Sequence, residues 1–170
     1  MILEPCCFRK QMSEWIDGKT AAEHFITFGD TDLQMLMDFL VHHAPECEVY
    51  LVQVQVEPET CRTINKLMEA KVKGTEVPLV KSFVLLHQGQ RRKEVNEALE
   101  KHRKSGRLLI CEHNAAFRCL CVGNQKHHFV LQGSIPQVQN YAMQMFTATK
   151  DEENYKHVMG ILNYPKKKKQ

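Results

Sequence analysis

The chain has 170 residues, enough for one domain with its own core and too few for two domains of ordinary size. Apolar residues make up 43% and charged residues 25%, a composition that excludes a disordered or fibrous protein. The formal net charge of +3 is mildly basic and does not by itself imply a nucleic-acid partner. No apolar run reaches the roughly 18 residues of a membrane span, and the start lacks a signal-peptide pattern. We therefore expect a cytoplasmic protein without membrane attachment.

The first half of the chain is predicted to alternate strands with helices. Residues 1–22 form an N-terminal extension, in which the spacing of Phe8, Met12 and Trp15 allows a short amphipathic helix. Beyond it, β-prone runs alternate with segments that carry apolar residues at helical spacing. The predicted elements are a strand at 24–28, a helix at 33–44, a strand at 47–56, a helix from Pro58 to Gly74, a strand at 77–86 and a polar helix at 88–103.

The second half is predicted to contain mainly strands. Alternation within the strand at 117–122 places Arg118 on the opposite face from Cys119 and Cys121. The other predicted elements are strands at 108–111, 129–131 and 143–147, a helix at 151–162 that Pro165 ends, and a basic disordered tail at 165–170. Together the two halves predict an α/β fold: a single domain over residues 23–164 with a mixed, partly parallel β-sheet flanked by helices on both faces.

This layout resembles one half of the phospholipase D-like fold, in the short single-motif form carried by phages and bacterial mobile elements. The resemblance rests on the strand at 24–28 followed by Gly29, on the segment Asn114-Ala115-Ala116-Phe117-Arg118, and on the strand that leads into Gly133-Ser134. Chains of that family with one motif pair to build a shared site. The resemblance therefore implies a homodimer.

The family's motif is His-x-Lys followed downstream by Gly-Ser-x-Asn, and this sequence departs from it. In the family the histidine attacks a phosphodiester, and the lysine and asparagine hold the phosphate oxygens. Here Ala116 stands at the histidine, Arg118 at the lysine and Pro136 at the asparagine, whereas Ser134 is kept. Ala116 cannot act as a nucleophile, but the resemblance implies that Arg118 and Ser134 still bind phosphate.

Two functional hypotheses follow, and neither requires a cofactor. The first is a catalytically degenerate phospholipase D-like domain that acts as a dimeric binding or scaffold module, for nucleic acid or for another phosphate-bearing ligand. The alternative is an active phosphodiesterase or nuclease with a rearranged site, in which a histidine outside the motif, such as His113 or His128, serves Arg118 and Ser134.

A metal site is a rival interpretation of the cysteines and histidines in the second half. Thiolate and imidazole groups are zinc ligands, but the spacing here is Cys-x-Cys rather than the Cys-x-x-Cys of a zinc knuckle. Cysteines within strands are also ordinary small core residues, and we expect no structural disulfides. The candidate ligands are Cys111, His113, Cys119 and Cys121.

Two basic segments are candidate contacts for nucleic-acid phosphates. The alternative interpretation is that these charges belong to an ordinary solvent-exposed surface that binds no ligand. The first segment is the C-terminal run Lys166, Lys167, Lys168 and Lys169. The second is the polar helix, whose ends carry Arg91, Arg92, Lys93, Lys101, Arg103 and Lys104.

Overall fold

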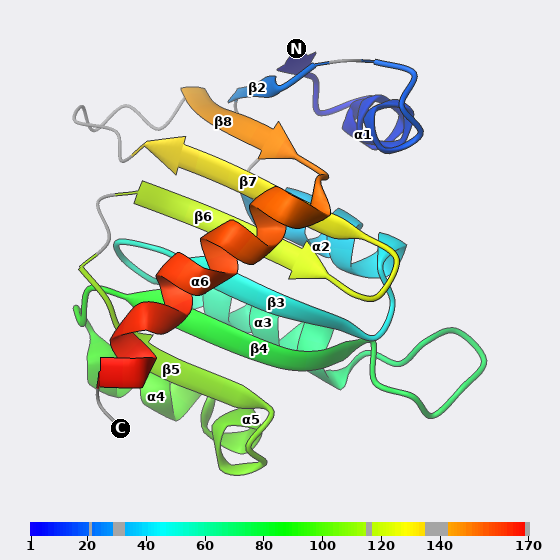
Figure 1. The fold of residues 1–170 in the computed structure, drawn as a ribbon. Helices are drawn as coiled ribbons and strands as arrows, with labels where there is room; N and C mark the ends of the chain where they lie inside the picture. The colour runs from blue at the N-terminus through cyan, green and yellow to red at the C-terminus, as the bar shows by residue number, and fades with distance from the viewer. Residues whose placement is uncertain (21, 29–32, 115–116, 135–142, 169–170) are drawn as a thin grey trace.

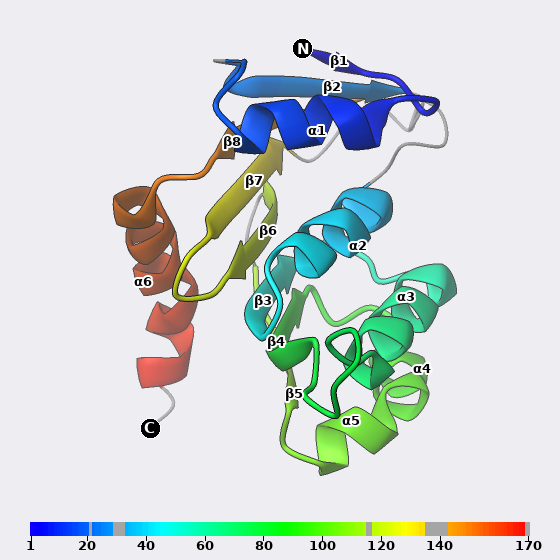
Figure 2. The ribbon, with the colours of Figure 1, turned by 90° about the vertical axis from the view of Figure 1, so that its right-hand side faces the viewer.

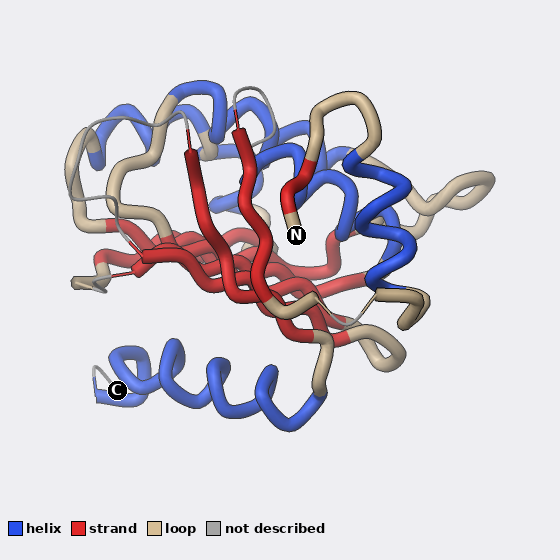
Figure 3. Tube along the Cα trace, turned by 90° about the horizontal axis from the view of Figure 1, so that it is seen from above, coloured by secondary structure: helices blue, strands red, loops and turns tan. Residues whose placement is uncertain are grey.

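The computed structural model describes residues 1–20, 22–28, 33–114, 117–134 and 143–168, with only the backbone described for residues 28, 117, 134, 143–144 and 163–168. At its centre is an eight-stranded sheet in the order β1-β2-β8-β7-β6-β3-β4-β5. Helices α1 to α5 cover one face, and α6 lies over the other (Figures 1 and 3). The predicted mixed sheet with helices on both faces is confirmed.

The sheet combines a parallel part with an antiparallel part. Strands β3, β4 and β5 run parallel to one another and are joined by helices, as the alternating first half of the sequence predicts. Strands β6, β7, β8 and β2 continue the sheet in antiparallel pairs, and the short β1 pairs parallel with β2. The strands are β1 (Ile2–Leu3), β2 (His24–Phe28), β3 (Cys47–Val52), β4 (Val80–His87), β5 (Leu108–Glu112), β6 (Phe117–Gly123), β7 (His128–Ser134) and β8 (Met143–Thr149).

Each face of the sheet buries its own apolar cluster. The larger cluster lies under α1 to α4 and includes Leu120 of β6 and Phe129 of β7 (Figure 2). The smaller one lies under α6 and includes Cys119 and Cys121. Strand β6 therefore alternates between the two faces as predicted. The helices are α1 (Phe8–Ile16), α2 (Leu33–His43), α3 (Pro58–Glu69), α4 (Arg92–Ala98), α5 (Glu100–Lys104) and α6 (Glu152–Lys168).

The N-terminal segment adds to the same sheet and core. Its β1 lies at the edge of the sheet, where the N-terminal amine donates a hydrogen bond of 2.7 Å to the His24 carbonyl. The predicted amphipathic helix forms as α1, and the Trp15 ring packs edge-on against Phe25 with centroids 5.2 Å apart. None of the described helices is both long and apolar enough to cross a membrane.

Several predicted boundaries are wrong. Strand β3 ends at Val52 rather than at residue 56, and its last residue pairs with Cys119 of β6. Helix α3 ends at Glu69, before Gly74, because Ala70 has extended dihedrals. The expected helix over 88–103 is two shorter helices, since Leu99 interrupts the helical dihedrals between α4 and α5.

The last helix is also longer than predicted. Helix α6 continues through Pro165 to Lys168, so the backbone of residues 165–168 is helical rather than a disordered tail. A proline removes one backbone donor, but its fixed φ is itself a helical value, so the helix can continue at the cost of a hydrogen bond.

Candidate phosphate-binding site

Arg118 and the backbone of Ser134 lie at the edge of the sheet where β3 and β4 end and β6 begins. Val52, the last residue of β3, pairs with Cys119, so Arg118 lies just beyond the end of β3. Arg118 in turn pairs with Gly133 of β7. In α/β sheets, ligands bind outside the carboxyl ends of the parallel strands. The fold therefore places Arg118 at the edge where a ligand is expected.

Arg118 is supported by an aromatic ring from two strands away. Its guanidinium carbon lies 6.0 Å from the ring centroid of Phe146, a residue of β8 that pairs with Gly133. Gly133 has no side chain, and a Cβ at this position would come within 3.0 Å of Phe146 Cδ1. The missing side chain lets the ring lie over β7 beneath the arginine. A cation held over a ring in this way gains about 0.5–1 kcal/mol at an exposed site.

His87, at the carboxyl end of β4, is the most buried polar residue of this edge. Its side chain is 1% exposed, and its Nδ1 accepts the backbone N–H of Gly89 at 3.0 Å. This hydrogen bond leaves the proton of the neutral ring on Nε2. Burial lowers the pKa of His87, with the charge of Glu112 acting in the opposite direction. The sequence prediction missed this residue, although a histidine directly after an apolar strand was the available signal.

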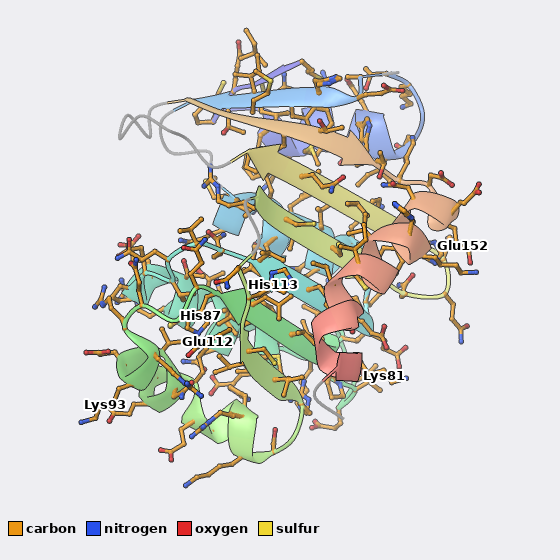
Figure 4. All side chains as sticks on the ribbon, turned by 60° about the vertical axis from the view of Figure 1, so that its left-hand side comes forward. Lys81, His87, Lys93, Glu112, His113 and Glu152 are labelled. Atoms are coloured by element: carbon orange, nitrogen blue, oxygen red, sulfur yellow. The ribbon has the colours of Figure 1, made fainter. Side chains whose placement is uncertain are left out.

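Glu112 and Gly89 pack tightly beside His87. The Glu112 carboxylate accepts a hydrogen bond of 2.8 Å from Arg92 Nη1. Gly89 has φ +90°, a conformation that favours glycine, and a Cβ there would lie 2.9 Å from Glu112 Cδ, so the glutamate side chain would have to move. Figure 4 shows His87, Glu112 and His113 together on one side of the molecule, with Lys81 and Glu152 on the other.

His113, which follows β5, lies at the same edge. Strand β5 is outermost next to β4, whereas β6 lies next to β3. The His113 N–H donates to the His87 carbonyl at 2.7 Å, which holds His113 at the end of β4. The strand order thus brings His87 and His113 to the same edge as Arg118.

Several predicted site residues lie beyond what the structure describes. Ala116, Pro136 and Lys169 are outside the described residues. The backbone of Ser134 pairs with Phe117 at the end of β7, but its side chain is also outside them, as are those of Lys166, Lys167 and Lys168. Among the four motif positions, Arg118 is the one whose side chain lies within the described part of the chain.

His128 cannot serve this site. It begins β7 and pairs with Gly123 at the far end of β6, whereas Ser134 ends β7. The two positions are six residue steps apart along the strand, a distance of about 20 Å at the usual rise per residue. His128 instead borders a groove of about 770 Å³ at the opposite end of the sheet, together with Lys81, Lys126 and Tyr155. Within one chain, His128 therefore lies too far from Arg118 and Ser134 to act with them.

The predicted metal ligands do not converge. The thiols of Cys119 and Cys121 lie 3.6 Å apart under α6, where the hydrogen bond to Cys119 and then burial raise the pKa of Cys121. His113 and Cys111 do not join them in a cluster. Among the described residues, the one group of three ligand atoms mutually within 4.8 Å is formed by Glu4, Cys6 and Cys7. The strand cysteines are small core residues, and all seven cysteines are free.

The positive charges at the ends of α4 and α5 are largely neutralised by acidic side chains nearby. Four of the six basic side chains named for this segment form ion pairs, so the surface is less positive than the sequence alone indicates. The pairs are Arg91–Glu57 at 3.6 Å, Arg92–Glu112 at 2.8 Å, Lys101–Glu69 at 3.3 Å and Lys104–Glu100 at 3.2 Å.

Comparison with known proteins identifies a similar fold. No protein-family model and no curated protein matches the sequence. Among solved structures, TrmBL2, described as an archaeal chromatin protein with a novel mode of DNA binding, matches with a TM-score of 0.58 and 12% identity. The match covers 94% of this chain and 59% of the TrmBL2 chain, so this chain spans little more than half of that protein. At this identity the likeness shows a shared fold.

Proposed function

We propose that this chain is a phospholipase D-like module without the family's nucleophile, which binds a phosphate-bearing ligand, foremost nucleic acid, at the Arg118 edge. The observation that carries the proposal is the position of Arg118, beyond the end of β3 and over the Phe146 ring. A guanidinium offers two parallel donors to phosphate oxygens. A side chain that is already supported also loses less freedom when the ligand binds.

Nucleic acid is favoured over other phosphate-bearing ligands by two observations. The similar fold of TrmBL2 belongs to a protein described as binding DNA. The chain also carries a net charge of +3, to which the lysines at 166–169 contribute four positive charges. Because the helix ends are compensated by ion pairs, we place the main contact at Arg118 and the lysine run rather than on α4 and α5.

Binding without turnover is supported by the absence of the family nucleophile and by the position of His113. Ala116 replaces the family nucleophile. The backbone of His113 is hydrogen-bonded to the end of β4, and β4 is separated from β6 by β3. Two strand spacings, about 10 Å, therefore lie between the His113 backbone and the start of β6. The His113 side chain would therefore have to extend over β3 to meet a phosphate held by Arg118.

The experiment is a DNA-binding titration of the purified chain over a series of salt concentrations, with product analysis on the same samples. We expect saturable binding whose logarithm falls linearly with the logarithm of salt, and intact DNA at the end. Absence of saturable binding at low salt would contradict the proposal. DNA cleavage that disappears in a His113→Ala variant would establish the phosphodiesterase alternative instead.

The same proposal includes a homodimer, as in single-motif chains of the family. Light scattering coupled to size exclusion should then give about twice the chain mass of 19.7 kDa. If the protein is a monomer at every concentration tested, a site shared by two chains is ruled out. Arg118 would then bind the ligand from one chain alone.

A further inference from the structure

The turn between β1 and α1 is held in a fixed shape. The Cys7 N–H donates to the Glu4 carbonyl at 3.0 Å and closes the turn. The Gln11 amide clamps the turn from the helix side: its Nε2 donates to the Ile2 carbonyl at 2.8 Å, and its Oε1 accepts the Glu4 N–H at 3.0 Å. The side chains that leave this turn are therefore positioned before any ligand arrives.

Three side chains of this turn point their donor atoms at one place. The ligand atoms of Glu4, Cys6 and Cys7 all lie within 4.8 Å of one another. Cys7 Sγ is 3.4 Å from Glu4 Oε2 and 3.7 Å from Gln11 Oε1. In tetrahedral zinc coordination, with Zn–S near 2.3 Å and Zn–O near 2.1 Å, a sulfur and an oxygen ligand lie about 3.6 Å apart. The separation of 3.4 Å between Cys7 Sγ and Glu4 Oε2 is close to this value, and Cys6 Sγ lies within 4.8 Å of Cys7 Sγ and of a Glu4 carboxylate oxygen.

We propose that Cys6, Cys7 and Glu4 form a site for a thiophilic divalent metal ion of the Zn²⁺ class. Two thiolates and a carboxylate supply three ligands, and water or the Gln11 carbonyl oxygen completes the tetrahedron. Thiolate ligands select soft or borderline ions over Mg²⁺ and Ca²⁺. Glu4 and Cys6 are exposed and Cys7 is partly exposed, so an ion can enter from solvent.

A bound ion would fasten the turn that carries β1. That strand is short, and its residues Ile2 and Leu3 pair with Ile26 and Thr27 of β2.

The test is a titration of the full chain with Cd²⁺, a spectroscopic substitute for Zn²⁺, under reducing conditions. We expect the ultraviolet thiolate-to-metal band to saturate at one equivalent and Zn²⁺ to displace it. The double variant Cys6→Ser with Cys7→Ser should lose the band, and Glu4→Gln should bind on the order of tenfold more weakly. The control variant is Cys111→Ser, in β5 at the opposite edge of the sheet from β1. It should titrate like the wild type.

Two outcomes would overturn the proposal. One is a wild-type chain that shows no saturable band at one equivalent. The other is a double variant that retains the band, which would place the metal on other cysteines. Circular dichroism of each variant confirms that it is folded, so loss of the band can be assigned to loss of ligands.

Discussion

The guanidinium carbon of Arg118 lies 6.0 Å from the ring centroid of Phe146, although the strand β7 separates the two residues. The contact depends on Gly133, which pairs with both residues and has no side chain to fill the space between them. The same glycine precedes Ser134, the serine of the family motif. A packing feature of the sheet thus positions Arg118, the residue to which we assign phosphate binding in our proposal.

Gly133→Ala should destabilise the protein. The added Cβ would lie 3.0 Å from Phe146 Cδ1 and 3.2 Å from the Met145 carbonyl oxygen, so the ring must shift. We expect the free energy of unfolding to fall by about 1–3 kcal/mol in urea denaturation. The matched control is Gly160→Ala in α6, where nothing lies within 4 Å of a Cβ and the change should stabilise by up to about 1 kcal/mol. Equal effects at both positions would refute the packing role of Gly133.

Arg107→Met should also destabilise the protein, for a different reason. The two terminal nitrogens of Arg107 donate to the carbonyls of Met68, near the end of α3, and Val80, at the start of β4. Removing a charged donor from both carbonyls should cost about 1.5–3 kcal/mol of unfolding free energy. Arg107→Lys should recover part of this loss, and Arg103→Met, on the exposed side of α5, should stay near the wild type. A negligible loss for Arg107→Met would mean that water replaces both hydrogen bonds.

The stability of the protein should fall in mild acid, partly through His87. Burial lowers the pKa of His87, so the unfolded chain takes up a proton at a higher pH than the folded one. Neutral His87 therefore contributes its full stabilisation above the pKa of histidine in the unfolded chain, about 6.5. This contribution is lost as the pH falls through the lower pKa of His87 in the folded protein. The pKa values of His102 and His127 are also lowered by burial and add to this trend.

The measurement is the free energy of unfolding by urea at about pH 7.5 and about pH 5. In His87→Asn the side-chain oxygen can still accept the Gly89 N–H, but the group no longer titrates, so the acid-induced loss should be smaller than in the wild type. His157→Asn, an exposed change in α6, serves as the control. A wild type that is equally stable at both pH values would contradict the role given to buried neutral histidines.

Metal binding at the Glu4–Cys6–Cys7 turn should weaken as the pH falls. The pKa of the Cys7 thiol is raised to about 11, so an ion that binds the thiolate must displace a proton. The apparent Cd²⁺ affinity should drop roughly tenfold per pH unit for each proton displaced. Proton release can be measured directly in a weakly buffered titration. An affinity independent of pH would show that the thiols are not the ligands.

Local patterns in the sequence predicted much of the fold. The alternation of β6 separated Leu120 from Cys119 and Cys121 correctly, and the apolar spacing that starts at Leu33 predicted α2. The boundaries were less accurate, because they depend on neighbours that are distant in the sequence. Strand β3 ends at Val52, opposite Cys119 of β6, and no residue near Val52 marks that end in the sequence.

The candidate sites were predictable only in part. Arg118 could be singled out from its motif position, but its support by Phe146 requires the order of β6, β7 and β8. The spacing of cysteines in the sequence pointed to candidate metal ligands around Cys119. In the structure, the potential metal-ligand atoms lie close together at Cys6 and Cys7 instead. That convergence depends on the closure of a turn by Gln11, which has no distinctive signature in the sequence.

The most direct test of the account is the DNA affinity of Arg118→Met compared with that of Lys93→Met, which removes an exposed charge from α4. Fluorescence anisotropy at low salt measures both. We expect Arg118→Met to bind at least about tenfold more weakly, with a shallower salt dependence, and Arg118→Lys to recover part of the affinity. Lys93→Met should remain close to the wild type. An Arg118→Met variant that binds as tightly as the wild type would contradict the assignment of the phosphate site to this edge of the sheet.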